Sequence, residues 1–298
     1  MTVTAADAGT WQLGDLTVNR LGFGAMRLTG GAVFGRGAPG DRDRSIGVLR
    51  HAVELGVNHI DTAAFYFSPL RSANELINRA LSPYPDDLVI ATKVGPGRDP
   101  SGAWLPWATP GQLRGQVEEN LRQLGRDHLD LVNLRAYPTD SIAEHFGALA
   151  ELRDAGLIRQ LGISSVRPAH LAQAQAIAPV VCVQNRYGIG THSGGADDFL
   201  RDCGEQGIAF VPYFAIAGEG REAGAGGSEH DEVLAIALAH GATPAQVRLA
   251  WTLQQGPHVL AIPGTSNPDH LTENVAAGAL RLSPGEMGRL QSLRHQAA

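Results

Sequence analysis

The sequence predicts an α/β fold, a (β/α)8 TIM barrel, on three observations. Short apolar runs of strand length alternate with helical patterns from about residue 20 to residue 276, which favours a parallel sheet with right-handed crossovers. Seven runs end on a polar or turn-forming residue of a different kind, and the chemistry of a parallel barrel lies where its strands end. The 298 residues suffice for a barrel of about 250 residues with some decoration.

The seven runs define the expected strands and the residues that meet at the barrel mouth. A strand buried in a parallel sheet reads as an apolar run. In chain order, the expected strands and the residues that end them are 57–60 with Asp61, 88–92 with Lys93, 129–134 with Arg135, 161–163 with Ser164, 180–183 with Gln184, 208–212 with Tyr213, and 259–262 with Pro263. We therefore expect one site assembled from seven strand ends.

The segments between the runs carry helical stripes and marked helix ends. One expected stripe consists of Leu113, Val117, Leu121 and Leu124. Capping boxes are expected at the helix starts Thr109, Ser141, Thr243 and Ser283. The glycines that follow a helix and precede a strand are Gly56, Gly156 and Gly207.

Further elements decorate the expected barrel. Residues 11–19 read as an N-terminal β-hairpin that could plug its bottom, and the segment from Ser283 onward reads as an extra C-terminal helix. Three irregular stretches, 30–43, 95–108 and 217–228, are expected as loops of the active face. No linker interrupts the pattern, so we expect a single (β/α)8 domain over residues 1–298.

The composition excludes several classes of partner. A net charge of −6, with scattered basic residues, argues against nucleic acid and acidic membranes as partners. No stretch approaches the roughly 18 apolar residues of a spanning helix. Residues 1–10 lack the features of a secretory signal, and two cysteines fit a reducing compartment. We therefore expect a cytoplasmic protein that is a monomer or a weak homo-oligomer.

Asp61, Tyr66 and Lys93 form the strongest chemical signal. Asp61 and Lys93 end consecutive strands, and Tyr66 lies in the loop after Asp61. A buried lysine is costly unless its charge is matched, and Asp61 is the expected match. A cation beside a phenol lowers the pKa of the phenol, so Tyr66 could donate a proton to a carbonyl oxygen near neutral pH. A structural Asp–Lys pair with an unrelated tyrosine remains the alternative.

Other motifs do not support a site. The G-x-G-x-x-G spacing at 35–40 lies inside an expected loop, where a dinucleotide fingerprint would join a strand to a helix. His59 and Asp61 share a strand face, but a metal site needs three or more converging ligands. Ser164 and Ser165 do not stand in the G-x-S-x-G pattern of a nucleophilic serine. We expect no metal and no hydrolase chemistry.

Several of these motifs together resemble the aldo-keto reductase family. The resemblance runs from about Leu21 to the C-terminal helix, and its motifs lie on separate strands in the family's order. They are 58–63 with Tyr66, 92–94, 262–266 and 270–274. The segments 24–26, 132–135 and 183–185 look most like the bacterial pyridoxal-reductase-type branch.

The resemblance implies an NADPH-dependent reductase that converts an aldehyde or ketone to the alcohol. It implies that Tyr66 is the general acid, that Lys93 lowers its pKa and that Asp61 holds Lys93. The positions that match those around the nicotinamide are Ser164, Ser165, Gln184 and Tyr213. Ser165 replaces the commoner Asn of the family, and strand-end packing is the alternative for Tyr213.

The resemblance also assigns a segment to the adenosine 2′-phosphate. The residues of this segment that are expected to contact the cofactor are Gly264, Thr265, Ser266, Asn267, His270, Glu273 and Asn274. A loop that leads into a helix start suits a phosphate. The resemblance implies NADPH as the cofactor. Gly264 and His270 stand where many relatives carry Lys and Arg, so NADH remains possible.

Arg135 is the main departure from the family, which usually carries His there to orient the substrate carbonyl. A guanidinium is permanently charged and offers several donors, so we expect Arg135 to bind an anionic or strongly polar group of the substrate. A structural ion pair, with Asp61 or another carboxylate, is the alternative. Trp104, Trp107 and Tyr137 could shape a flat aromatic pocket for a small-molecule carbonyl substrate.

Three other functions stay open at this point. Because Arg135 stands where the family usually carries a catalytic His, the chain could be a cofactor-binding regulatory subunit without efficient turnover. It could instead be a biosynthetic imine or carbonyl reductase of secondary metabolism. A metal-dependent hydrolase barrel is the third alternative, and bound metal would identify it.

Overall fold

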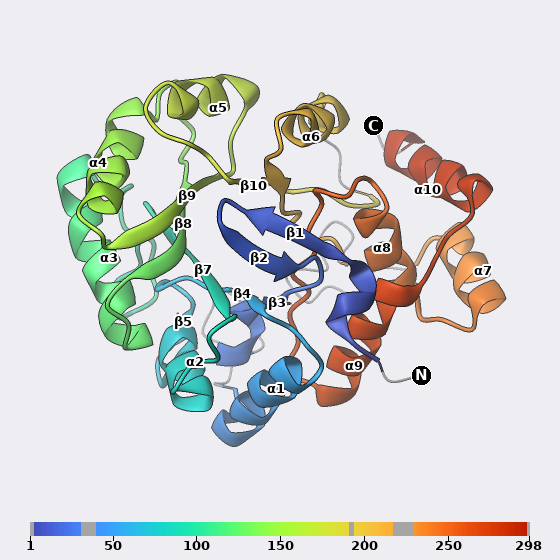
Figure 1. Ribbon diagram of the computed structural model, residues 1–298. Helices are drawn as coiled ribbons and strands as arrows, with labels where there is room; N and C mark the ends of the chain where they lie inside the picture. Colours follow the sequence, from blue (N-terminus) through green and yellow to red (C-terminus); the bar gives the residue numbers. More distant parts are fainter. Residues whose placement is uncertain (1–2, 31–39, 191–193, 217–228, 297–298) are drawn as a thin grey trace.

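The computed structural model describes residues 3–30, 40–190, 194–216 and 229–296. At its centre, parallel strands form a curled sheet in the order β11-β10-β9-β8-β7-β4-β3 (Figure 1). These strands are β3 (Phe23–Gly24), β4 (His59–Asp61), β7 (Val89–Val94), β8 (Leu129–Arg135), β9 (Ile158–Ser164), β10 (Cys182–Gln184) and β11 (Ala209–Phe210). The strand order follows the chain order, as in a barrel built by successive crossovers.

The segment around residue 260 closes the sheet into a barrel. Val259 forms a parallel bridge to Phe210 at one edge, and Ala261 forms a parallel bridge to Leu21 at the other edge. The amide of Leu260 donates to the carbonyl of Phe210 at 2.9 Å, and the amide of Gly22 donates to the carbonyl of Ala261 at 2.8 Å. This segment therefore acts as the eighth strand, and the predicted (β/α)8 TIM barrel is confirmed.

A ring of helices surrounds the strands (Figure 1). The helices of the ring are α1 (Arg42–Glu54), α2 (Ala73–Leu81), α3 (Pro110–Leu124), α4 (Ala143–Asp154), α5 (Pro168–Gln175), α6 (Ala196–Glu205), α8 (Pro244–Leu253) and α9 (Pro268–Ala276). Two more helices, α7 (Asp231–His240) and α10 (Pro284–Gln296), lie outside the ring beside α8. Thus α10 is the expected C-terminal helix. None of the described helices has the length and apolarity to cross a membrane.

Helix starts follow the capping pattern with one correction. Thr243 caps α8 with both hydrogen bonds of a capping box. The expected box at Ser141 was wrong, because α4 begins after Ile142. The amide of Ile142 donates to the side chain of Gln173 at 3.0 Å, and Ile142 is fully buried. This contact with the neighbouring helix delays the start of α4.

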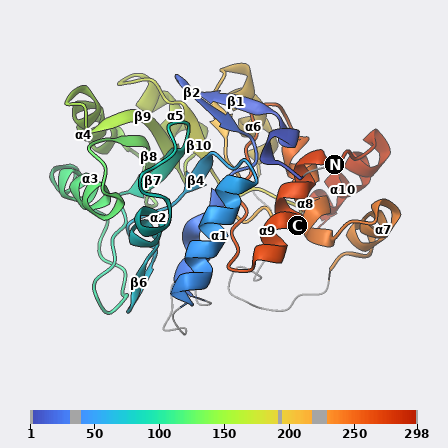
Figure 2. The ribbon, with the colours of Figure 1, turned by 60° about the horizontal axis from the view of Figure 1, so that its bottom comes forward.

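The N-terminal hairpin plugs one end of the barrel, as expected. It consists of β1 (Thr10–Leu13) and β2 (Leu16–Asn19), and it lies across the centre of the ring of helices (Figure 1). Its apolar side chains Leu13, Leu16 and Val18 pack into the floor of the barrel. Figure 2 shows the hairpin at one end of the barrel and β6 (Arg71–Ser72) at the opposite end.

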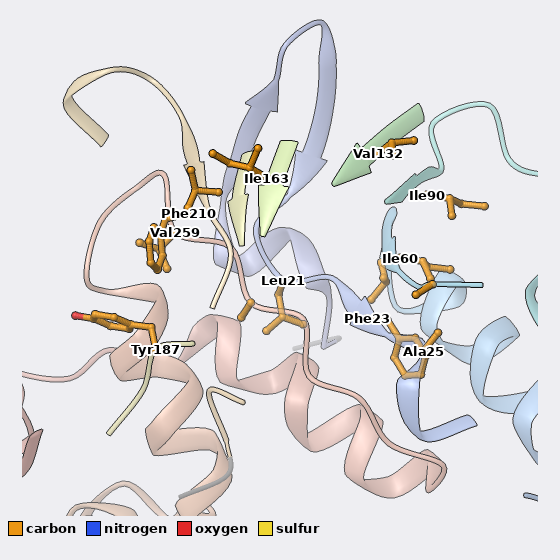
Figure 3. Close-up of a cluster of buried hydrophobic side chains, with 14 of the residues drawn as sticks. Leu21, Phe23, Ala25, Ile60, Ile90, Val132, Ile163, Tyr187, Phe210 and Val259 are labelled. Carbon is orange, nitrogen blue, oxygen red and sulfur yellow. The ribbon is translucent and has the colours of Figure 1, made fainter. Parts of the chain in front are cut away.

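The alternation of side chains along the strands separates the core from the site. Outward-facing residues such as Ile60, Ile90 and Val132 pack in the layer between strands and helices (Figure 3). Inward-facing residues are apolar near the hairpin and polar at the opposite end. On β7, for example, Val89 and Ala91 line the floor, and the next inward position is Lys93. The polar site therefore lies at the carboxyl ends of the strands.

Candidate active site

A buried ion pair forms the centre of the site. The Nζ of Lys93 lies 2.5 Å from Oδ1 of Asp61, and each side chain is 5% exposed. The ammonium also donates to the carbonyl oxygen of Thr62 at 3.0 Å, and it lies 5.0 Å from the centroid of the Tyr66 ring. The structure thus brings Asp61, Tyr66 and Lys93 together, as the strand-end pattern predicted.

The pKa of Tyr66 corrects one expectation. Burial raises the pKa of Tyr66 above its usual value of 10.0, and the positive charges of Lys93 and Arg135 oppose this rise without overcoming it. The expectation of a lowered pKa was therefore wrong for the free protein, because desolvation of the phenolate is the largest effect. Burial alone would lower the pKa of Lys93, but Asp61 and Tyr66 hold it above 10.5. Both groups keep their protons at neutral pH.

Gln184 binds the second oxygen of the Asp61 carboxylate. Its Nε2 donates to Oδ2 of Asp61 at 2.8 Å, so both oxygens of Asp61 are engaged by Lys93 and Gln184. The Oε1 of Gln184 is buried and has no hydrogen-bond partner among the described residues, and the same holds for Oδ1 of Asn133. A buried unpaired acceptor is costly, so Gln184 presents an acceptor that a bound donor would satisfy.

Arg135 lies beside this centre in an aromatic setting. Its guanidinium carbon lies 5.6 Å from the ring centroid of Phe65 and 5.9 Å from that of Trp104. Within the described part of the chain, Arg135 forms no ion pair with a carboxylate, and Asp61 is bound by Lys93 instead. The alternative of a structural pair with Asp61 does not describe this arrangement. The half-buried guanidinium of Arg135 contacts the faces of two aromatic rings, so its N–H groups can still donate hydrogen bonds to a bound group.

The loop between β7 and α3 brings aromatic residues to the site in different roles. Trp104 in this loop is 44% exposed, and Tyr137, in the loop between β8 and α4, is 59% exposed, so a ligand can reach both rings. Trp107 instead stacks on His145 with centroids 3.7 Å apart, and its Nε1 donates to the carbonyl oxygen of Arg135 at 3.0 Å. In this structure Trp107 therefore holds the end of the strand that carries Arg135.

Gly95 is needed where this loop leaves β7. It has a φ of +111°, and a Cβ there would lie 2.6 Å from Nε1 of Trp107 and 2.7 Å from the carbonyl oxygen of Arg135. Gly95→Ala should therefore lower the free energy of unfolding by more than about 1 kcal/mol. Gly97→Ala in the same loop is the matched control, since its Cβ would meet Leu105 at an ordinary 3.5 Å. Equal stability of the two variants in denaturant titrations would contradict the claim that position 95 requires glycine.

The strand-end residues expected around a nicotinamide converge on one side of the site. Ser164 ends β9 and is 1% exposed. Ser165 has a φ of +59°, a left-handed conformation that Asn adopts more readily than Ser. Its hydroxyl lies 3.2 Å from the hydroxyl of Tyr213. Ser165 thus fixes the position of the Tyr213 ring.

The expected phosphate segment forms a loop and the start of α9. Asn267 caps α9 by accepting a hydrogen bond from the amide of Asp269 at 3.0 Å, and Thr265 accepts one from the amide of Asn267 at 3.0 Å. Ser266 and His270 are exposed. In the same segment, Gly264 packs directly on Gly24, Glu273 is half-buried, and Asn274 is buried.

The packing of Gly264 explains the missing basic residue at that position. A Cβ on Gly264 would collide with the carbonyl oxygen of Gly24, and a Cβ on Gly24 would lie 2.6 Å from the carbonyl oxygen of Ile262. Any side chain at position 264 would therefore push apart β3 and the segment that closes the barrel.

Sequence reasoning missed a set of buried polar residues behind the site. Asn74 on α2 and Asn120 on α3 are fully buried and hydrogen-bonded to each other, to Thr62 just after β4 and to Thr92 on β7. The spacing in the sequence could have shown that Asn120 is buried, because Asn120 stands three residues after Val117, at a core position of its helix.

Two segments singled out in the sequence lie outside the described residues. The G-x-G-x-x-G spacing at 35–40 does so except for Gly40, and the expected loop 217–228 does so entirely. Among the described side chains, no three His, Cys, Asp or Glu residues converge as metal ligands.

A (β/α)8 barrel with a buried Asp–Lys pair beside a tyrosine at its carboxyl-terminal mouth defines a class of oxidoreductase, and comparison with known proteins gives the family. The sequence matches the Aldo/keto reductase family over residues 20–295. It is 44% identical to pyridoxine 4-dehydrogenase of Escherichia coli, over 97% of this chain and 99% of that protein. It is 37% identical to an uncharacterized oxidoreductase of Schizosaccharomyces pombe, over 97% of this chain and 90% of that protein.

Solved structures agree with this assignment. The thermostable aldo-keto reductase Tm1743, crystallised with the inhibitor epalrestat, superposes with a TM-score of 0.79 at 30% identity, covering 95% of this chain and 99% of that chain. An aldo-keto reductase of Klebsiella pneumoniae in complex with NADPH gives a TM-score of 0.77 at 27% identity, covering 93% and 92%. The chain belongs to the aldo/keto reductase family.

Proposed function

We propose that the protein reduces an aldehyde or ketone to the alcohol with NADPH, and that Tyr66 is the general acid. The observation that carries this proposal is the ammonium of Lys93, which is held 2.5 Å from Asp61 and lies against the ring of Tyr66. When bound, the reduced nicotinamide supplies the hydride. The protein orients the carbonyl and delivers the proton to its oxygen.

Tyr66 is suited to donate that proton. Its pKa lies above 10.0 because the phenol is buried, so the hydroxyl carries its proton throughout the neutral range. As the carbonyl oxygen becomes negative, the proton moves from the phenol to that oxygen, and the resulting phenolate lies beside the Lys93 ammonium. The same cation thus stabilises the product of proton transfer, which lowers the barrier.

The residues present fit the nicotinamide end of the cofactor. Gln184 offers a buried acceptor that lacks a partner among the described residues, and a carboxamide carries the donor that it needs. Tyr213, fixed by Ser165, presents an aromatic ring on which a planar heterocycle can stack. We therefore assign Ser164, Ser165, Gln184 and Tyr213 to this end.

The adenosine end is expected to distinguish NADPH from NADH less strongly than in relatives with basic residues there. The start of α9 and the side chains of Thr265, Ser266 and Asn267 can supply hydrogen bonds to a phosphate, and position 270 carries an imidazole in place of a guanidinium. We propose NADPH as the preferred cofactor and NADH as a weaker one.

The decisive experiment is a steady-state assay. Loss of NADPH absorbance is followed with a panel of aldehydes that includes pyridoxal, plain aromatic aldehydes and carboxylated aldehydes, and NADH is tested in parallel. Pyridoxal is included because the chain is 44% identical to a pyridoxine 4-dehydrogenase. Tight NADPH binding without turnover on any member would favour the regulatory-subunit alternative. Turnover of imines in preference to every aldehyde would favour the biosynthetic imine reductase.

Arg135 is expected to select substrates with an anionic or strongly polar group. Its guanidinium lies against the ring of Phe65, the residue before Tyr66, and it forms no ion pair with a carboxylate among the described residues. Arg135→Leu should therefore lower kcat/KM for a carboxylated aldehyde by about 10- to 100-fold, the value of a charged hydrogen bond. The loss for an uncharged aldehyde should be much smaller. Arg153→Leu, which removes a charge from the outer surface of α4, is the control. An unchanged kcat/KM for the charged substrate would remove this role.

A further inference from the structure

The loop that carries Tyr66 is closed at its base by a buried hydrogen bond. This loop leaves β4 at Thr62 and returns at the start of α2. The hydroxyl of Thr62 donates to Oδ1 of Asn74 at 2.8 Å, and the amide of Ala73 donates to the carbonyl oxygen of Tyr66 at 2.9 Å. The Thr62–Asn74 contact therefore sets where the loop begins and ends.

A second link ties this base to the strand that carries Lys93. The Nδ2 of Asn74 donates to Oδ1 of Asn120 at 2.9 Å, and the hydroxyl of Thr92 donates to the same oxygen at 2.6 Å. Asn74 donates its second amide proton to Oε1 of Gln123 at 3.0 Å, and Asn120 donates to the carbonyl oxygen of Gln116 at 2.8 Å. We call the Asn74–Asn120 pair, with its two threonine contacts, the amide bridge.

The amide bridge is fully buried at a place where apolar side chains could pack the helices against the strands equally well. Thr62, Asn74, Thr92 and Asn120 are each 0% exposed, and they lie in the layer between strands and helices that also holds the main apolar core. Burying polar groups costs free energy that their mutual hydrogen bonds only offset. What a satisfied polar network adds is direction, because its bonds form in one relative arrangement of the elements.

That arrangement is coupled to the Lys93 ammonium. The carbonyl oxygen of Thr62 accepts a hydrogen bond from Nζ of Lys93 at 3.0 Å, and Thr92 is the residue before Lys93. We propose that the amide bridge is a positioning device, in which Asn74 and Asn120 hold the Tyr66 loop and the Lys93 strand at the separation that proton transfer requires. This inference rests on the proposed role of Tyr66.

The test compares Thr62→Val with Thr62→Ser. Valine keeps the volume of threonine and removes the hydroxyl, whereas serine keeps the hydroxyl and removes the methyl group. If the bridge positions Tyr66, kcat for aldehyde reduction should fall about 10- to 100-fold in Thr62→Val, the scale of a small misplacement of a reacting group. Thr62→Ser should stay within about threefold of the wild type, and KM for NADPH should change in neither variant. Loss of kcat in Thr62→Ser equal to that in Thr62→Val would overturn the inference.

Two further variants keep the test decisive. Thr92→Val and Thr92→Ser ask the same question from the other end of the bridge if Thr62→Val does not fold. Asn78→Ala is the matched control, since Asn78 also joins α2 to α3, through a hydrogen bond of 3.2 Å to the carbonyl oxygen of Gln123, but touches neither strand end. A kcat loss in Asn78→Ala as large as in Thr62→Val would mean that general loosening of the helices is the cause.

The outcome also separates this inference from the proposed function. If Tyr66→Phe is inactive and the valine and serine variants are alike, only the amide bridge fails. If Tyr66→Phe turns over like the wild type, the proposed function fails and the inference falls with it.

Discussion

Tyr66→Phe is expected to cut steady-state turnover of an aldehyde by on the order of 10²-fold or more, while NADPH binding is preserved. The substitution removes one oxygen from a side chain that is 7% exposed, so the ring keeps its packing against Phe65. What is lost is the only proton that this account delivers to the carbonyl oxygen. Turnover is measured by NADPH consumption, and binding by the change in NADPH fluorescence.

The matched control for this variant is Tyr187→Phe. Tyr187 is another buried tyrosine. Its hydroxyl donates a hydrogen bond of 2.7 Å to Asp197, and it takes no part in the contacts around Lys93. Removing that hydroxyl should affect stability and leave the chemical step nearly unchanged. Near-normal turnover in Tyr66→Phe, or an equal loss in both variants, would refute the role of Tyr66 as the acid.

Lys93→Met is expected to have the largest effect on stability. The substitution leaves the carboxylate of Asp61, 4% exposed, without its counter-charge in the barrel interior. Breaking a buried pair in this way typically lowers the free energy of unfolding by about 3–5 kcal/mol. Turnover should also fall steeply, because the phenolate formed from Tyr66 would lose the ammonium that lies against its ring. Denaturant titration and the NADPH assay measure the two effects.

A double variant separates the two effects of Lys93→Met. Asp61→Asn with Lys93→Met removes both charges and can keep the hydrogen bond to Gln184, so most of the lost stability should return. Turnover should not return, since no ammonium lies near Tyr66. If the double variant recovers turnover together with stability, the ion pair is structural and Lys93 does not stabilise the Tyr66 phenolate.

The sequence predicted the barrel because the signals of a βα unit are local. Continuous apolar runs, helix-start patterns and helix-ending glycines each span only a few residues, and the glycines expected to end helices do adopt positive φ, for example +81° at Gly56. The strand-end rule then brought Asp61, Lys93 and Arg135 together without any knowledge of the turns. This success rests on the parallel arrangement of the strands, because their carboxyl ends all meet at one end of the barrel.

The failures concern interactions between elements. The stripe expected through Leu121 is shifted, since Asn120 is fully buried and Leu121 is only partly buried. A buried asparagine is acceptable there only because Asn74 and Thr92 reach it from other elements. The pKa of Tyr66 was misjudged for the same reason, because the depth of burial depends on neighbours such as Phe65 that spacing does not reveal.

The most direct test of the central claim is a crystal structure with the oxidised dinucleotide and a carboxylated substrate analogue bound. We expect the Tyr66 hydroxyl to contact the oxygen of the analogue, with Lys93 still held by Asp61 and the carboxylate of the analogue bound to Arg135. A Tyr66 hydroxyl that points away from both the nicotinamide ring and the analogue in every copy would contradict it.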